Sequence, residues 1–312
     1  MAKIKRPIVI LIAIIVAITA CVGIVGIVHC NKYKITFELN DTLPDGNGKK
    51  AKVILLGGQS NASGCSLDEY LKNNVSSEKY AEYQSGYNNV YINYLSGSNT
   101  SKAFVKCATL QGELAGGFGP ELGLAEKLNE MYPNELFFII KCAWGGTNLY
   151  EEWLSPSSSG KTGKLYKQFV AFVSQSLEYL QSKNYDIEVE GMCWMQGESD
   201  SLDRETAIEY ESNLSNFIND IRDKFKGYSS SNGIAFIDAK IAASFFWTHY
   251  ELVNQSKANV ENLSPLNVLI DTISEGLTVT EEPQPTPDIA HYDSLSEIKL
   301  GNLFAEKISL YF

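Results

Sequence analysis

The sequence predicts an α/β fold of three layers, in which helices cover both faces of a central, mostly parallel sheet. Short apolar runs alternate with amphipathic helical segments along the chain, and this alternation is typical of βαβ units. The first run, Val53-Ile-Leu-Leu56, holds no polar residue, as expected of a strand buried on both faces. We expect a domain over residues 51–312, preceded by a linker at 31–50 and a membrane anchor or signal segment at 1–30.

The remaining elements follow from periodicity, glycines and prolines. The region from Ser63 to Gly119 is rich in polar residues and reads as irregular, with an inserted hairpin formed by residues 89–94 and 103–108. Further strands are predicted at 136–143, 187–194, 234–238 and 268–271. Helices are predicted at 120–131, 165–180, 204–225, 251–262 and 294–310.

The N-terminal segment has the pattern of a transmembrane helix. No charged residue occurs from Pro7 to Val28, and three positive charges precede this stretch. A helix of that length, at about 1.5 Å per residue, spans a bilayer core. The positive flank would stay in the cytoplasm, so the domain would be extracytoplasmic. The alternative is a lipoprotein acylated at Cys21, because Ile18-Thr-Ala-Cys21 resembles a bacterial processing site; a cleaved signal also stays open.

Charge and cysteine spacing exclude some classes of function. The net charge of −11 argues against nucleic-acid binding, which needs a basic surface. The six cysteines show no Cys-x-x-Cys spacing, so we expect no zinc site and no metal or organic cofactor. A disulfide is allowed in an exported domain, but its pairing stays open.

Ser60 is the first candidate for a reactive group. It follows the first predicted strand and two glycines, at the sheet edge where open α/β folds bind their ligands. A serine nucleophile needs a base, usually histidine, which a carboxylate orients. Of His29, His249 and His291, only His291 lies on a loop beside an aspartate three positions away, Asp288. An ordinary polar loop at Ser60 and a merely solvated His291 remain the alternatives.

Five short motifs occur in order along the chain. They are Gly58-Gln-Ser-Asn61, Gly119-Pro-Glu121, Lys141-Cys-Ala-Trp-Gly-Gly-Thr147, Trp194-Met-Gln-Gly-Glu-Ser-Asp200 and Asp288-Ile-Ala-His-Tyr292. With these motifs in this order, the chain resembles the sialate O-acetylesterase-like family, which is similar to carbohydrate esterase family six and belongs to the SGNH hydrolases. The resemblance extends from about Val53 to the C-terminus.

The resemblance implies a role for each matching residue. Ser60 would be the nucleophile, His291 the base and Asp288 the acid that orients it. The oxyanion hole would use the N–H groups of Ser60 and Gly146 and the side chain of Gln196. Glu198 is an alternative or second acid, or else a structural residue of its loop. The residues expected to contact substrate are Gln59, Asn61, Gly145 and Thr147.

The implied function is that of an exported serine esterase. It would remove O-acetyl groups from carbohydrates, such as acetylated sugars or sialic acid-like substrates, through an acetyl-serine intermediate. Its partners would be a small or polymeric O-acetylated substrate and the membrane. The alternatives are a carbohydrate-binding or surface-interaction protein on the same fold, without turnover, and a lipase or thioesterase of the same superfamily.

Overall fold

The computed structural model describes residues 36–312. Its main sheet has eight strands, in the order β10-β9-β8-β1-β7-β3-β4, with β5 paired to β3. A second, two-stranded sheet pairs β2 (Ser66–Leu67) with β6 (Gly117–Phe118). The strands of the main sheet are β1 (Lys50–Gly58), β3 (Val90–Ser96), β4 (Asn99–Thr100), β5 (Val105–Lys106), β7 (Phe137–Ala143), β8 (Asp186–Met195), β9 (Ala235–Ala239) and β10 (Asn267–Ile270).

The central strands are parallel and buried, as the apolar runs predicted. β1 lies between β7 and β8 and pairs parallel with both. β3, β9 and β10 extend the parallel arrangement, and only β4 and β5 pair antiparallel, both with β3. Residues 53–56 are 0% exposed, because layers of helices cover both faces of the sheet. The predicted three-layer fold with a mostly parallel sheet is confirmed.

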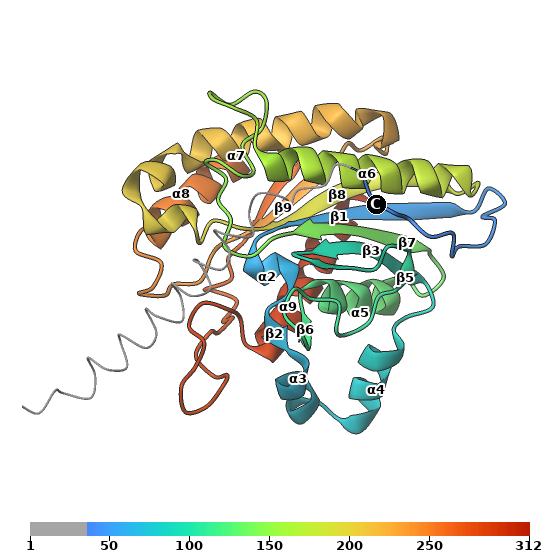
Figure 1. Ribbon diagram of the computed structural model, residues 1–312, viewed down its shortest axis with the longest axis horizontal. Helices are drawn as coiled ribbons and strands as arrows, with labels where there is room; N and C mark the ends of the chain where they lie inside the picture. The colour runs from blue at the N-terminus through green and yellow to red at the C-terminus, as the bar shows by residue number, and fades with distance from the viewer. Residues whose placement is uncertain (1–35) are drawn as a thin grey trace, which may run out of the picture. The chain divides into compact units, whose positions relative to one another are not determined.

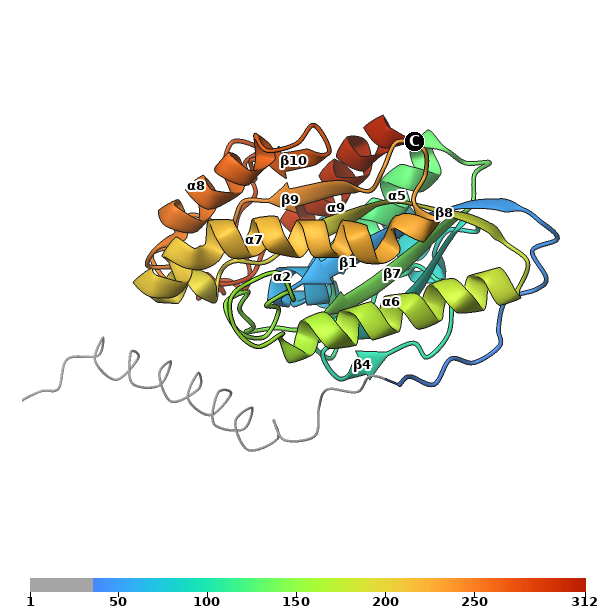
Figure 2. The ribbon, with the colours of Figure 1, turned by 90° about the horizontal axis from the view of Figure 1, so that it is seen from above.

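Helices lie on both faces of this sheet. Figure 1 shows α6 and α7 along one face and α5 and α9 along the other, and Figure 2 shows α6 and α7 crossing in front of the strands. The five predicted helices all form, and α7 has the predicted bounds. They are α5 (Glu121–Met131), α6 (Lys164–Ser182), α7 (Arg204–Phe225), α8 (Tyr250–Glu261) and α9 (Ser294–Ile308).

The region from Ser63 to Gly119 is more regular than predicted. It contains two helices, α3 (Asp68–Asn74) and α4 (Ser77–Ser85), that the irregular composition did not reveal. The predicted pairing of segments 89–94 and 103–108 is confirmed, because residues 105–106 pair antiparallel with residues 91–92, but the pair is not an insertion outside the main sheet. β3 belongs to the main sheet, because it pairs in parallel with β7 along its whole length and buries Val90 and Ile92 completely.

The described part of the predicted linker packs on the domain. The ring of Phe37 contacts that of Phe172 in α6 with centroids 5.0 Å apart, and Leu43 is 5% exposed. Residues 37–43 therefore belong to the folded surface, which corrects the linker prediction there. The predicted membrane segment and Cys21 lie outside the described residues. Within residues 36–312, no helix has both the length and the apolar character needed to cross a membrane.

The strand register brings three of the motifs together. Gly58, the last residue of β1, is the register partner of Ala143 in β7 and of Met195 in β8. Since parallel strands end at the same edge, the segments that follow these three residues start side by side. Those segments carry Ser60, Gly145–Thr147 and Gln196–Asp200, and so the centre of the sheet positions the candidate site.

Candidate active site

Ser60 begins a four-residue helix, α2 (Ser60–Ser63), directly after β1 and Gln59. The turn into this helix requires glycine at position 58, where φ is +137° and an added Cβ would lie 1.9 Å from the carbonyl oxygen of Met195. Ser60 is 6% exposed. As the first helical residue its backbone N–H has no intrahelical acceptor, which leaves it available for the predicted oxyanion role.

Asp288 and His291 form a hydrogen-bonded pair on the loop before α9. The Nδ1 atom of His291 lies 2.6 Å from Oδ2 of Asp288. The other carboxylate oxygen, Oδ1, accepts the N–H of Ala290 at 3.0 Å. This geometry holds the imidazole by Nδ1, as expected of an orienting acid.

The surroundings of this pair shift both pKa values. Burial lowers the pKa of His291, but the hydrogen bond with Asp288 and the nearby Cys65 outweigh burial and hold it well above its usual value. Burial raises the pKa of Asp288, and the hydrogen bond with His291 reverses this, so the net shift is downward. Each partner therefore stabilises the charged form of the other.

Asn61 connects the segment of Ser60 to the loop of His291. Its Oδ1 accepts the N–H of Tyr292 at 3.0 Å, and its Nδ2 lies 3.4 Å from the carbonyl oxygen of Ala290. The same Nδ2 donates to Oε1 of Glu198 at 2.7 Å. The residue after the candidate nucleophile thus contacts the residues on both sides of the candidate base.

Glu198, which accepts from Asn61, is 0% exposed. Burial raises its pKa, and the hydrogen bond from Asn61 and the charges of Lys257 and His291 oppose that rise only in part. Its Oε2 has no hydrogen-bond partner within residues 36–312. The carboxylate that contacts His291 Nδ1 is that of Asp288, and Glu198 bonds to Asn61 instead.

The loop after β7 contains the predicted Gly145-Gly146-Thr147 segment. Gly146 has φ of +68°, and an added Cβ there would meet nothing within 4 Å, so this residue borders open space. The N–H of Gly145 instead donates to Oε2 of Glu113 at 2.7 Å. Within residues 36–312 the N–H of Gly146 has no hydrogen-bond acceptor, whereas that of Gly145 is already used.

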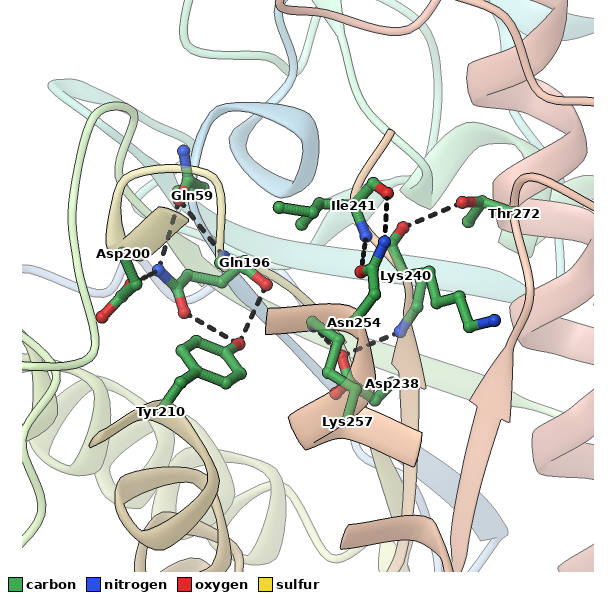
Figure 3. Close-up of polar contacts among 12 residues, drawn as sticks. Gln59, Gln196, Asp200, Tyr210, Asp238, Lys240, Ile241, Asn254, Lys257 and Thr272 are labelled. Carbon is green, nitrogen blue, oxygen red and sulfur yellow. Dashed lines mark hydrogen bonds and ion pairs between the residues drawn. The ribbon is translucent and has the colours of Figure 1, made fainter. Parts of the chain in front are cut away.

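Gln196 lies at the centre of a buried hydrogen-bond network (Figure 3). Its Nε2 is 2.5 Å from Oδ2 of Asp200 and 3.1 Å from the carbonyl oxygen of Thr147. Its Oε1 accepts from the hydroxyl of Tyr210 at 3.1 Å. Both amide hydrogens therefore have acceptors inside the protein, and Gln196 is 0% exposed. This arrangement corrects the prediction that Gln196 supplies an oxyanion donor.

Three predicted substrate contacts are also internal. Gln59 is 1% exposed, and its Oε1 faces Nε2 of Gln196 and the N–H of Ser199. Asn61 is 1% exposed and is bonded as described above. Thr147 is 4% exposed; its Oγ1 donates to the carbonyl of Trp144 and accepts from Nε1 of Trp153. These side chains hold the loops in place, and their burial separates them from a substrate.

The sequence analysis did not identify two polar residues at this edge of the sheet, Glu113 and Ser63. Glu113 accepts hydrogen bonds from Ser63 Oγ at 2.6 Å and from the N–H of Gly145 at 2.7 Å. Its partners are 50 and 32 positions away along the chain. Contacts between segments so far apart leave no local pattern in the sequence, and neither Glu113 nor Ser63 lies in one of the five motifs.

Comparison with known proteins identifies the family. The family model described as carbohydrate esterase, sialic acid-specific acetylesterase, matches residues 50–309. A search of curated proteins finds no match. Solved structures share the fold. A protein from Arabidopsis thaliana has a TM-score of 0.62 at 20% identity over 86% of this chain and 100% of its own.

Two further structures have similar architecture. NanS gives a TM-score of 0.62 at 16% identity, covering 86% of this chain and 98% of that chain. A carbohydrate acetylesterase from Xanthomonas citri gives 0.54 at 18% identity, covering 81% of this chain and 55% of that chain. At these identities the likenesses show a shared fold, whereas the family match covers most of the sequence. The chain therefore belongs to the carbohydrate esterase family of sialic acid-specific acetylesterases, and it is a carboxylic ester hydrolase.

Proposed function

We propose that the chain removes O-acetyl groups from carbohydrates through an acetyl intermediate on Ser60. The observation that carries the proposal is the pairing of His291 with Asp288 at 2.6 Å on a loop that Asn61 ties to the helix of Ser60. The base and its orienting acid are thus attached, through Asn61, to the helix that begins with the proposed nucleophile. Family membership supports the carbohydrate ester as substrate.

In the first step, Oγ of Ser60 attacks the acetyl carbonyl while Nε2 of His291 accepts its proton. Asp288 stabilises the imidazolium that forms, because its carboxylate already contacts Nδ1. Collapse of the tetrahedral intermediate breaks the ester bond, and His291 returns the proton to the departing sugar oxygen. Ser60 is left acetylated.

In the second step, a water molecule replaces the sugar. His291 takes a proton from this water, whose oxygen attacks the acetyl-serine, and acetate leaves as Ser60 regains its proton. In both steps the N–H groups of Ser60 and Gly146 would stabilise the negative oxygen. Each such donor contributes roughly 2.7–4 kcal/mol in characterised hydrolases.

Hydrolysis of p-nitrophenyl acetate by the purified full-length protein tests this mechanism. Ser60→Ala should lower kcat by about 10³-fold or more, since the nucleophile is lost. A fluorophosphonate should label the wild-type chain at Ser60, as peptide mapping would show. Equal rates for wild type and Ser60→Ala, or a label on another serine, would contradict the proposed nucleophile.

The acyl and sugar preferences test the substrate class. A series of p-nitrophenyl esters of increasing chain length should show the highest kcat/KM for acetate. Release of acetate from an O-acetylated sialic acid, compared with an acetylated xylo-oligosaccharide, would distinguish the sugar classes. A preference for long acyl chains would favour a lipase or thioesterase instead.

We also propose that residues 7–28 anchor the protein in a membrane, with the esterase domain on the extracytoplasmic side. The support is the uncharged stretch and its basic flank. The full-length protein should sediment with membranes and be digested by protease added to intact cells. Cys21→Ser should remain membrane-bound; its release would support acylation at Cys21 instead.

A further inference from the structure

Glu113 lies where three segments of the candidate site meet. The loop of residues 108–116 approaches the end of α2, where the N–H of Glu113 donates to the carbonyl oxygen of Gly64 at 3.0 Å. Gly64 is the C-cap residue of α2. The backbone of Glu113 is therefore attached to the helix that begins with Ser60.

One carboxylate oxygen of Glu113 joins this helix to the loop of Gly146. Oε2 accepts from the hydroxyl of Ser63, the last residue of α2, at 2.6 Å. It also accepts from the N–H of Gly145 at 2.7 Å. Both distances lie within the normal range of hydrogen bonds for these atoms, so one oxygen is bonded to both segments.

Two glycines border this carboxylate, on two sides of the partly exposed side chain. An added Cβ at Gly97 would lie 2.5 Å from Oε1 of Glu113, and one at Gly145 would lie 3.0 Å from Oε2. Gly97 has φ of +58°, and its N–H donates to the carbonyl of Ala143 at the end of β7. The turn after β3 and the loop after β7 therefore border the side chain on two sides, which restricts its position.

We propose that Glu113 is a positioning residue, which sets the nucleophile helix and the Gly146 loop at the separation that hydrolysis requires. The inference rests on the proposed function, in which Ser60 attacks and Gly146 donates to the oxyanion. Gly145 precedes Gly146, so a bond that fixes the N–H of Gly145 also restricts the peptide plane of its neighbour. Glu113 acts through these groups and need not contact the substrate.

Because one oxygen of Glu113 accepts both hydrogen bonds, it restricts the separation between α2 and the loop of Gly146. A displacement of the loop relative to α2 would lengthen one of the two bonds to Oε2, so the pair is satisfied only within a narrow range of separations. Ser63 is 0% exposed, and without Glu113 its hydroxyl keeps only the carbonyl oxygen of Ser60 at 3.2 Å, a bond within α2 that does not hold the loop. Misplacement of an oxyanion donor by about 1 Å can reduce turnover by about 100-fold.

The test compares Glu113→Ala and Glu113→Gln with the wild type in p-nitrophenyl acetate hydrolysis. Glu113→Ala should lower kcat by about 10- to 100-fold with KM changed less than about threefold, because the lost interaction orients groups that act in the transition state. Glu113→Gln keeps a carbonyl oxygen that can accept both bonds, so it should recover most of the kcat.

Two further variants make the result specific. Ser63→Ala removes one of the two bonds and should cause a smaller fall in kcat than Glu113→Ala. Glu135→Ala is the matched control, because Glu135 is a partly exposed glutamate paired with Lys52 next to the start of β7, away from the site; its kcat should match the wild type. If Glu113→Ala does not fold, as judged by circular dichroism, Gly97→Ala displaces the carboxylate while keeping its charge and should lower kcat in the same way.

Several results would overturn the inference. These are a wild-type kcat in Glu113→Ala, a raised KM with unchanged kcat, which would indicate a substrate contact, or equal losses in the Gln and Ala variants. The proposed function fails separately, if Ser60→Ala retains the wild-type rate. The two failures are therefore distinguishable in one series of measurements.

Discussion

Asn61 Oδ1 accepts the backbone N–H of Tyr292 at 3.0 Å, across 231 positions of sequence. The contact joins the residue after Ser60 to the residue after His291. It ties the segment of Ser60 to the loop of His291 through an amide side chain that also bonds to the buried Glu198. Ser66 Oγ donates to the carbonyl oxygen of Tyr292 at 2.7 Å and joins the same two segments. The resemblance assigned Asn61 to the substrate, whereas its geometry makes it part of the scaffold.

Removal of this amide should impair both turnover and stability. We expect Asn61→Ala to lower kcat by roughly 10- to 100-fold and the free energy of unfolding by about 1–3 kcal/mol, because buried groups lose their partners. Kinetics with p-nitrophenyl acetate and urea unfolding measure the two effects. Asn262→Ala, at an exposed amide on the end of α8, is the control and should change neither.

Asn61→Asp separates hydrogen bonding from charge at the same position. The new carboxylate would face Glu198, which is fully buried, and could no longer donate to it. We expect a larger loss of activity at pH 8 than at pH 5, since repulsion requires both groups to be ionised. A loss that is the same at the two pH values would contradict this account of the contact.

Asp288→Asn should change the pH dependence of the reaction. The pKa of His291 is held above its usual value, and a base acts only when neutral, so kcat/KM should rise with pH through that raised pKa. Loss of the Asp288 charge lowers the pKa of His291, so the rise of kcat/KM with pH should occur at lower pH. The plateau rate should fall by about 100-fold or more, because the imidazole is no longer held in the correct tautomer. If the rise of kcat/KM occurs at the same pH in the variant, Asp288 does not set the pKa of His291.

Gly58→Ala should destabilise the fold by roughly 3 kcal/mol or more, because its φ of +137° and the carbonyl of Met195, 1.9 Å from an added Cβ, both oppose a side chain. Thermal and urea unfolding measure the loss. Gly227→Ala is the matched control: an added Cβ there meets nothing within 4 Å, and its effect should stay within about 0.5 kcal/mol. Similar stabilities of the two variants would contradict the strained turn.

Asp200 should contribute a pH-dependent part of the stability. Burial raises its pKa to about 7, above the value near 3.9 of an unfolded chain. The folded state thus favours the protonated form, and this stabilisation is present below about pH 4 and lost as the pH rises to about 7. Urea unfolding across this range should show a steeper decline for wild type than for Asp200→Asn. Parallel profiles would contradict the assignment.

The features that the sequence predicted correctly depend on residues close together along the chain. Residues 53–56 are all apolar, and only a strand covered on both faces suits such a run. The ends of β1, β7 and β8 carry glycine-rich motifs, and their parallel register brought these together as expected. The pairing of Asp288 with His291 followed from a separation of three residues on one loop.

The direction of polar side chains was not available from the sequence. Gln59, Asn61, Thr147 and Gln196 lie beside the site in their motifs, and nothing in a motif distinguishes a side chain that faces substrate from one that fastens a loop. Burial decides that question, and burial depends on segments far away in the chain. The same holds for Glu113, whose partners come from two distant segments of a region without periodicity.

The spread of the proposed reacting groups along the chain determines when esterase activity can appear during folding. Ser60 follows β1 and Gly146 follows β7, whereas Asp288 and His291 come after β10. A chain that has formed only the N-terminal or only the C-terminal half of the sheet therefore holds no complete set of the proposed reacting groups. Recovery of esterase turnover during refolding would consequently time the joining of the two halves, and could be followed against the earlier return of helical signal.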